Sequence, residues 1–376
     1  MDIYGKKKNA YKNVGFFCAI ILAFLIGDLI CPDIFFSENE NRILTSKPKI
    51  SKEGLLQGIY MEKYEAYMND QFVGRNNWIR LKTYSDILLQ KKEINGVYLA
   101  EDGYLIEQHP VENYDQETIE SKITLLQQLC RRFPQTCVML VPTADNILQR
   151  KMPLFAPAFD QRAFLNQVKE AVGEEKVIDL FPILEEHEEE EIYYRTDHHW
   201  TTLGAYYGYQ SFAKAYGLPA KNYLRKEPVA VTESFQGTLQ SKLNLPQKAE
   251  KIYMFPQTMD KEYEITYDGV RKTGSFYEEK YLTGKNKYGY FLDDNHGIVE
   301  IERKSYSKKV LFVIKDSYAN SMIPLLAHHY KKVYIVDPRY FNGDLFSYMD
   351  SCNEYKDMDV LVLYDCIHFI EDFKYN

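Results

Sequence analysis

Short apolar runs alternate with helical patterns over most of the chain beyond residue 115. Uninterrupted apolar runs predict buried strands at 137–141, 177–180, 310–314, 333–336 and 360–363. Apolar residues at helical spacing predict helices at 117–133, 164–172, 202–216 and 321–330. Apolar strands separated by helices are typical of a parallel sheet that is covered on both faces. The pattern therefore predicts an α/β domain.

Two other stretches depart from this rhythm. Residues 225–305 are rich in Tyr, Gly, Lys and Asp and contain strand-like fragments at 263–267 and 298–301, which predicts an antiparallel insertion. Closer to the N-terminus, helical patterns cover 55–67 and a segment from Arg75 that includes Trp78, Leu81 and Leu88. Two short strands at 97–99 and 104–106 flank Asp102-Gly103, a pair typical of a type I′ turn.

The N-terminal 36 residues carry a topological signal. Four lysines at positions 6, 7, 8 and 12 precede an apolar run from Val14 to Ile30, and Pro32 follows. A run of this length can span a bilayer, and positive flanks stay cytoplasmic. The small-residue pattern of a cleavage site is missing around 31–33, which favours an anchor over a cleaved signal. We expect residues 1–36 to be a cytoplasmic tail and single-pass anchor, and residues 37–376 to lie outside the cell membrane.

Charge and cysteine content narrow the classes of function. With 46 Lys and Arg against 54 Asp and Glu, the net charge of −8 argues against nucleic-acid binding, which needs clustered cations. Of the six cysteines, Cys18 and Cys31 belong to the apolar segment or its edge. None of the six has the spacing of a thiolate zinc site. A Cys130–Cys137 disulfide and buried free thiols both remain open.

Two polar segments follow predicted strands, where open α/β sheets place their sites. Asp197 and His199 precede the helix at 202–216, and Ser317 follows the strand at 310–314. A serine hydroxyl is a weak nucleophile unless an imidazole takes its proton and a carboxylate orients that imidazole. Alternatively, Ser317 caps a helix.

A metal site is the other interpretation of the Asp197-His198-His199 triplet, because such triplets occur in manganese phosphoesterases. Those enzymes need several further Asp and His motifs, and this chain has few. We therefore predict neither a metal nor another cofactor.

The motifs at 194–201, 37–42 and 314–320 together resemble the DHHW family of bacterial proteins, which is similar to the alginate O-acetylation proteins. The resemblance covers nearly all of the chain after the apolar run. It implies an SGNH-hydrolase-like three-layer α/β/α domain, with the β insertion at about 225–305 and one transmembrane helix before it. Asp and His precede Ser here, the reverse of ordinary SGNH hydrolases, which suggests a permuted topology.

The resemblance also implies roles for the three side chains. Asp197 becomes the orienting carboxylate, His199 the general base and Ser317 the nucleophile, although Lys315 stands where the related motif has glycine. An oxyanion hole needs donors aimed at the developing charge. The candidates are the backbone amide of Ser317 or its neighbour and the side chains of Asn295 and Asn146.

Three further residues of these segments are candidates for contact with substrate, with an ion pair or simple packing as the alternative for each: Arg195, Tyr318 and Arg339. By resemblance, the function is O-acetylation of a cell-surface polysaccharide, with a membrane-bound O-acyltransferase as acetyl donor. An acetylesterase of the same fold would use the same triad. A catalytically silent glycan-binding or assembly protein is the alternative from another class.

Overall fold

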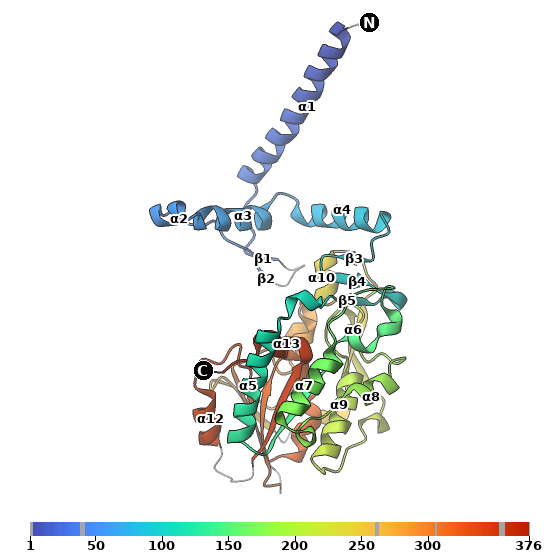
Figure 1. Cartoon of the computed structure of the whole chain (residues 1–376), viewed down its shortest axis with the longest axis vertical. Coiled ribbons are helices and arrows are strands. Elements are labelled where there is room, and N and C mark those ends of the chain that lie inside the picture. Colours follow the sequence, from blue (N-terminus) through green and yellow to red (C-terminus); the bar gives the residue numbers. More distant parts are fainter. Residues whose placement is uncertain (1–2, 38–41, 260–262, 305–306, 353–357, 376) are drawn as a thin grey trace. The chain divides into compact units, whose positions relative to one another are not determined.

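The computed structural model describes residues 3–37, 42–259, 263–304, 307–352 and 358–375. They form two compact units (Figure 1). The first consists of Met1–Lys91 with Leu243–Leu245, and the second of Lys92–Lys242 with Pro246–Asn376. Residues 38–41 of the motif at 37–42 lie outside the described part of the chain.

The first unit is mainly helical. Its elements are α1 (Ile3–Ile30), β1 (Phe36–Ser37), β2 (Arg42–Ile43), α2 (Lys52–Leu56), α3 (Ile59–Gln71) and α4 (Arg75–Leu88). Within α1, the 20 residues Tyr11–Ile30 have a mean hydropathy of 2.2, and none of them is buried. By length and composition this helix could cross a membrane, or serve as a signal sequence.

The second unit begins with a small antiparallel sheet of β3 (Glu93–Ile94), β4 (Val97–Leu99) and β5 (Leu105–Glu107). The chain turns between β4 and β5 at Asp102 and Gly103, whose φ angles are 56° and 77°. A type I′ turn requires positive φ at both central residues, and the Asp-Gly pair provides them.

The second unit is built on a seven-stranded mixed sheet, counted over the described residues. The strand order is β10-β9-β11-β13-β12-β14-β6. The strands are β6 (Thr136–Val141), β9 (Tyr263–Tyr267), β10 (Arg271–Thr273), β11 (Ile298–Arg303), β12 (Val310–Lys315), β13 (Lys332–Val336) and β14 (Met358–Asp365). The last three and β6 run parallel, whereas β9, β10 and β11 pair antiparallel. Every residue of β12 is buried, as its uninterrupted apolar run predicts.

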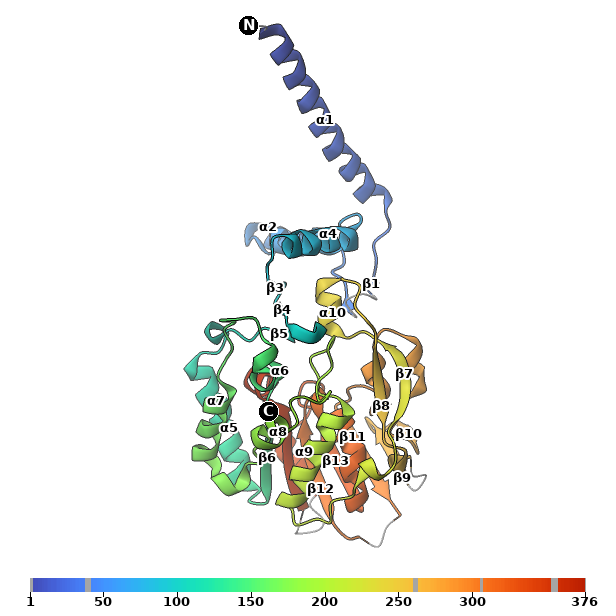
Figure 2. The same ribbon diagram turned by 90° about the vertical axis from the view of Figure 1, so that its right-hand side faces the viewer.

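Helices follow β5 along the chain, and the fold is α/β. They are α5 (Gln116–Arg132), α6 (Ala144–Ile147), α7 (Gln161–Val172), α8 (Phe181–Glu186), α9 (Thr202–Ala215), α10 (Thr238–Leu243), α11 (Ile323–Leu326), α12 (Leu345–Cys352) and α13 (Cys366–Asp372). Figure 1 shows α12 and α9 on opposite sides of the strands, and Figure 2 shows α9 in front of them. On the α12 side, the ring of Tyr348 packs on Phe312 of β12 and Tyr334 of β13.

Two predicted elements are shorter than their patterns suggest. The strand predicted at 177–180 is reduced to a single bridge between Val138 and Val177, because helix α8 begins at Phe181 directly after it. The helix predicted at 321–330 is divided into a 3₁₀ turn ending at Ser321, the short α11 and a second 3₁₀ turn. Pro324 lies in the first turn of α11, where its missing N–H costs no hydrogen bond.

The β-rich stretch at 225–305 contributes to two sheets. Strands β7 (Val229–Phe235) and β8 (Glu250–Met254) form a separate two-stranded sheet. By contrast, β9, β10 and β11 extend the main sheet at its antiparallel edge. All six cysteines lie in the described part of the chain and are free thiols, which includes Cys130 and Cys137.

Candidate active site

Ser317 lies where strand β12 ends. It is the first residue of a 3₁₀ turn that runs to Ser321, and the side chain of Asp316 caps this turn by accepting a hydrogen bond from the Tyr318 N–H (2.9 Å). The other carboxylate oxygen of Asp316 accepts the Asp365 N–H of the neighbouring strand (2.9 Å). Ser317 is therefore held at the carboxyl edge of the parallel strands, with 8% of its surface exposed.

Asp197 and His199 lie in the loop that leads into helix α9. The loop is held by Trp200, which is fully buried and donates its indole N–H to the carbonyl of Tyr318 (2.8 Å). Glycine is required at position 208 of α9, because a Cβ there would lie 2.8 Å from the Trp200 ring. The hydrogen bond from Trp200 to Tyr318 ties the loop that carries His199 to the turn that carries Ser317, although Trp200 and Tyr318 are 118 residues apart in sequence.

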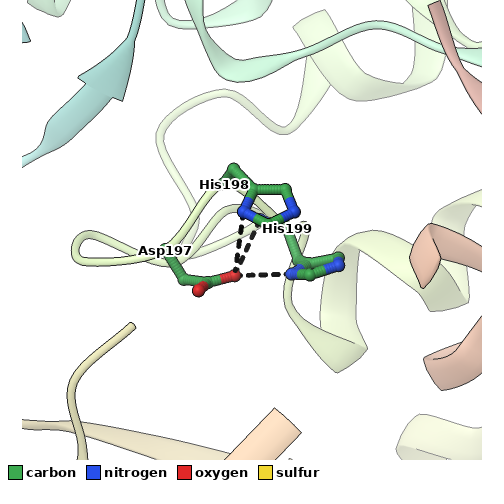
Figure 3. Close-up of side chains that lie close together, drawn as sticks. All are labelled: Asp197, His198 and His199. Atoms are coloured by element: carbon green, nitrogen blue, oxygen red, sulfur yellow. Dashed lines mark hydrogen bonds and ion pairs between the residues drawn. The ribbon is translucent and has the colours of Figure 1, made fainter. Parts of the chain in front are cut away.

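The three side chains form a continuous hydrogen-bonded chain. Nδ1 of His199 lies 2.5 Å from Oδ1 of Asp197, and Nε2 of His199 lies 2.9 Å from Oγ of Ser317. Figure 3 shows the Asp197 carboxylate facing the rings of both His198 and His199. Proton transfer from a serine hydroxyl to an imidazole requires this arrangement, in which one ring nitrogen faces the carboxylate and the other the hydroxyl.

Asp197 remains ionised despite its burial. Burial alone would raise its pKa, but His198, His199 and the hydrogen bond from the Thr238 N–H hold the pKa well below its ordinary value. Burial and the neighbouring His199 lower the pKa of His198 to about 4. The negative charge on Asp197 and a neutral His198 leave His199 as the ring that the carboxylate orients.

The segment Gly237-Thr238 clamps the second oxygen of Asp197. Oδ2 accepts hydrogen bonds from the Thr238 N–H (2.9 Å) and the Thr238 hydroxyl (3.2 Å). The same hydroxyl lies 2.9 Å from Nδ1 of His198. Gly237 passes so close that a Cβ on it would lie 2.2 Å from Cβ of Asp197. The carboxylate is thus fixed from both sides, and only glycine fits at position 237.

Glu250 of β8 fixes the backbone just before Asp197. Its carboxylate accepts hydrogen bonds from the N–H groups of Arg195 (2.6 Å) and Thr196 (2.7 Å). On the other side of the site, the ring of Tyr288 stacks on His199 with a centroid separation of 3.9 Å, and its hydroxyl donates to the Ser317 carbonyl. The 225–305 stretch therefore supplies the residues that hold the imidazole and its carboxylate in place.

Sequence patterns gave no signal for these supporting residues: Gly237, Thr238, Glu250 and Tyr288. None belongs to a motif, and each is 40 or more residues from Asp197 in sequence. A glycine followed by a threonine is a weak cue to a functional site, because such pairs also occur at ordinary helix starts. Their contribution follows only from the tertiary contacts.

Lys315, which precedes Asp316, is buried with 1% of its side chain exposed. Its ammonium donates to Oδ1 of Asn320 (2.8 Å) and Oδ1 of Asn295 (3.1 Å), and lies 3.3 Å from Asp337. Burial lowers the pKa of Lys315. The lysine that replaces glycine thus faces away from the hydroxyl of Ser317 and into a polar cluster behind the turn.

The two predicted oxyanion donors lie in different surroundings. Asn295 belongs to the Lys315 cluster, where its amide N–H donates to Asp294. Asn146 is held elsewhere, by a hydrogen bond to the Phe159 carbonyl (3.0 Å) and one from the Gln161 N–H (3.2 Å). The structure does not bring either side chain into hydrogen-bonding contact with Ser317 among the interactions it describes.

The three candidate substrate residues make internal contacts. Tyr318 is fully buried and donates its hydroxyl to the His198 carbonyl. Arg339 forms a two-pronged ion pair with Asp337 (2.9 and 2.8 Å). Arg195 is half-exposed, pairs with Glu191 (2.7 Å) and lines a surface cavity of about 800 Å³. Tyr318 and Arg339 also line cavities, of about 140 and 130 Å³, which are smaller than the cavity beside Arg195.

Two clusters of the described residues bring three potential metal ligands within 4.8 Å of one another. In Asp197-His198-His199, the 2.5 Å separation of oxygen and nitrogen is that of a hydrogen bond, whereas two ligands of one tetrahedral metal lie about 3.3 Å apart. In Asp316-Asp365-His368, the charge on Asp365 raises the pKa of His368 to about 10, so a proton occupies the ring nitrogen. Both clusters are arranged as hydrogen bonds.

A cavity of about 140 Å³ adjoins Asp197 and His198. Its wall also includes His109 and His368, whose Nδ1 atoms bond to Asp145 (3.0 Å) and Asp365. The wall is thus rich in groups that exchange hydrogen bonds with hydroxyls, and it does not include Ser317.

Comparison with known proteins gives a consistent picture. The DHHW protein family matches residues 138–336, and no curated protein matches the chain. A crystal structure of a DHHW family protein from Eubacterium siraeum is 21% identical, covers 74% of this chain and 93% of its own, and has a TM-score of 0.60. Bacillus cereus PatB1 with a sulfonyl adduct is 22% identical, covers 75% of this chain and 100% of its own, and has a TM-score of 0.61. The O-acetyltransferase domain of Pseudomonas putida AlgJ is 16% identical, covers 75% of this chain and 94% of its own, and has a TM-score of 0.44.

Proposed function

The chain belongs to the DHHW family, and from this premise we propose that it is a serine O-acyltransferase that works through Asp197, His199 and Ser317. The observation that carries the proposal is the unbroken hydrogen-bonded chain from the Asp197 carboxylate through the His199 ring to the Ser317 hydroxyl. It stands on an SGNH-like three-layer α/β/α fold.

The reaction has two steps. Oγ of Ser317 attacks the acyl carbonyl while Nε2 of His199 takes its proton, and the donor's leaving group departs with that proton to give an acyl-serine. An acceptor hydroxyl then loses its proton to the same nitrogen and attacks the acyl-serine, which restores the Ser317 hydroxyl. Asp197 stabilises the imidazolium that forms in each step.

The negative charge that develops on the acyl oxygen needs donors close to Ser317. The backbone N–H of Ser317 is suited to this, because no acceptor for it is found in the described part of the chain, whereas the Tyr318 N–H is bonded to Asp316. Of the predicted side-chain candidates, Asn295 is linked to the β12 end through its hydrogen bond from Lys315 (3.1 Å). We propose the Ser317 amide as the first donor.

The acyl group is acetyl and the acceptor is a hydroxyl of a cell-surface polysaccharide in this proposal. The cavity beside His198 supports a hydroxyl-rich acceptor, because three histidines and several carboxylates that can exchange hydrogen bonds with hydroxyls line it. A membrane-bound O-acyltransferase supplies the acetyl group. The apolar span Tyr11–Ile30 anchors the chain in the membrane by a single pass, with the second unit outside the cytoplasm.

The proposal is tested with the full chain in detergent and p-nitrophenyl acetate as the acyl donor. We expect release of p-nitrophenolate and an acetyl group on Ser317. The variant Ser317→Ala should lose activity by about 10⁴-fold or more. Ser351→Ala, which changes a serine at the end of α12, serves as the matched control and should retain full activity. A sulfonyl fluoride should label Ser317, and PatB1 with its sulfonyl adduct suggests this probe.

Adding an acetyl-free oligosaccharide then separates the alternatives. If more acetyl groups are transferred to the oligosaccharide than are released as acetate by hydrolysis, the result supports the transferase. Hydrolysis without transfer to the oligosaccharide supports an acetylesterase. A folded chain that neither hydrolyses the ester nor reacts with the sulfonyl fluoride would contradict both and support the silent glycan-binding protein.

A further inference from the structure

Helix α4 of the first unit has an apolar face that is exposed. Trp78, Leu81, Tyr84, Leu88 and Leu89 are exposed by 44, 55, 49, 84 and 70%. Trp78, Leu81, Tyr84 and Leu88 are three or four residues apart, which places them along one side of the helix, and Leu89 follows at its C-terminal end. Four large apolar side chains on one side of a short helix, with a fifth at its end, are unusual for a surface that faces only water.

The opposite side of α4 is already occupied. Thr83 is buried, and its hydroxyl donates to the carbonyls of Ile79 and Leu243 (2.9 and 3.0 Å). Asn244 donates its side-chain amide to the Asn76 carbonyl (2.7 Å). The polypeptide segment Leu243–Leu245 therefore covers the polar side of the helix and leaves the apolar side outward.

The start of α4 is attached to the end of the apolar span in α1. The ring centroid of Phe24 lies 5.6 Å from the ring centroids of both Phe72 and Trp78. Asp28 accepts a hydrogen bond from the Val73 N–H (2.9 Å). Within this unit, Figures 1 and 2 show α3 and α4 lying crosswise to α1. The apolar face of α4 thus begins at the level where the apolar span of α1 ends.

The charge of this segment also differs from that of the chain. Residues 75–91 contain four basic side chains and one acidic one, Asp86, whereas the chain as a whole carries −8. Asp86 is itself paired with Lys91 (2.7 Å). A basic amphipathic helix with Trp and Tyr on its apolar side has the composition of helices that lie in a membrane interface, where anionic lipids attract the cations.

We propose that α4 lies along the outer surface of the bilayer that α1 spans, with Trp78, Leu81 and Leu88 in the boundary between lipid headgroups and acyl chains. The inference rests on the membrane anchor proposed above. The partner is the lipid itself, because the face adjoins the apolar span of α1 where the rings of Phe24 and Trp78 are in contact. Two contact points with the bilayer, a span and a flat helix, would fix the orientation of the first unit against the membrane.

The chain contains its own optical probe for this test. It has two tryptophans, Trp78 on the apolar face and Trp200, which is fully buried in the second unit. The full chain is inserted into vesicles of phosphatidylcholine and phosphatidylglycerol, with part of the lipid brominated near the headgroup end of its acyl chains. We expect the brominated lipid to quench the Trp78 emission, and Trp78→Phe to abolish this quenching while leaving the Trp200 emission unchanged.

A second variant, Leu81→Glu with Leu88→Glu, keeps Trp78 and adds charge to the face. It should reduce the quenching by brominated lipid and expose Trp78 to acrylamide in the water phase. Vesicles of phosphatidylcholine alone should give weaker quenching, because they lack the anionic lipid that attracts the basic residues of α4. Vesicle flotation after an alkaline wash reports on α1 independently of α4.

The outcomes are distinct. A chain that floats with the vesicles while acrylamide quenches Trp78 and brominated lipid does not would overturn the inference and leave the anchor intact. A chain that floats while neither agent reaches Trp78 would mean that protein covers the face, and would also overturn it. A chain that fails to float would refute the anchor, and the inference with it.

Discussion

Replacing Gly237 by alanine tests whether the position of the Asp197 carboxylate controls the reaction. The added Cβ would lie 2.2 Å from Cβ, 2.3 Å from Oδ2 and 2.7 Å from Cα of Asp197. Cβ atoms in protein structures are essentially never closer than 3.0 Å to a heavy atom of a residue that is not their own or their chain neighbour. Two of these three contacts are with atoms close to the backbone, which cannot rotate away. Asp197 or the Gly237 backbone must therefore move.

The required displacement is about 1 Å, and a displacement of this size in a catalytic arrangement costs on the order of 100-fold in rate. This corresponds to about 2.7 kcal/mol of transition-state stabilisation. The loss should appear in kcat, because Asp197 acts on the reaction through its hydrogen bond to His199. KM should change little.

The assay is the hydrolysis of p-nitrophenyl acetate by the full chain, together with the rate of labelling of Ser317 by a sulfonyl fluoride. Gly297→Ala is the control, since its Cβ would lie 2.8 Å from the Tyr340 carbonyl oxygen and produce a milder backbone clash that does not involve Asp197. Thermal unfolding of both variants separates loss of folding from loss of geometry. A folded Gly237→Ala variant with unchanged kcat would refute the reasoning.

Two other predictions concern neighbouring groups. Thr238→Val removes the hydroxyl that donates to Asp197 (3.2 Å) but keeps the backbone donor, so kcat should fall roughly 10-fold, which corresponds to about 1.4 kcal/mol. Thr238→Ser keeps a hydroxyl and should restore kcat. Equal activity of the Val and Ser variants would contradict a positioning role for the hydroxyl. Asp365 raises the pKa of His368 from 6.5 to about 10, so its proton stabilises the fold fully below pH 6.5 and this stabilisation is lost as the pH rises towards 10. Thermal melts should show the wild type losing stability between pH 6.5 and 10 and His368→Gln losing less, and parallel curves for the two chains would contradict this.

The candidate site shows which of its features the local sequence can predict and which it cannot. The spacing of Asp197 and His199 and the position of Ser317 after an apolar strand made these three side chains candidates, and the family resemblance gave each its role. These are properties of short segments, because a two-residue spacing and a strand end are set by local backbone geometry. The sequence could not show that Lys315 points into a buried polar cluster or that the Asn146 amide is engaged by the Phe159 carbonyl.

The sequence by itself determined the α/β rhythm, the buried character of β12 and the apolar span of α1, since periodicity and uninterrupted apolar runs specify local structure and burial. Only the tertiary structure decided that β9, β10 and β11 extend the main sheet, and that Gly237, Thr238 and Tyr288 hold Asp197 and His199. The contacts to Asp197 and His199 join residues that are 40 or more positions apart in sequence. Such pairings depend on how the whole chain packs, and no local pattern of side chains encodes them.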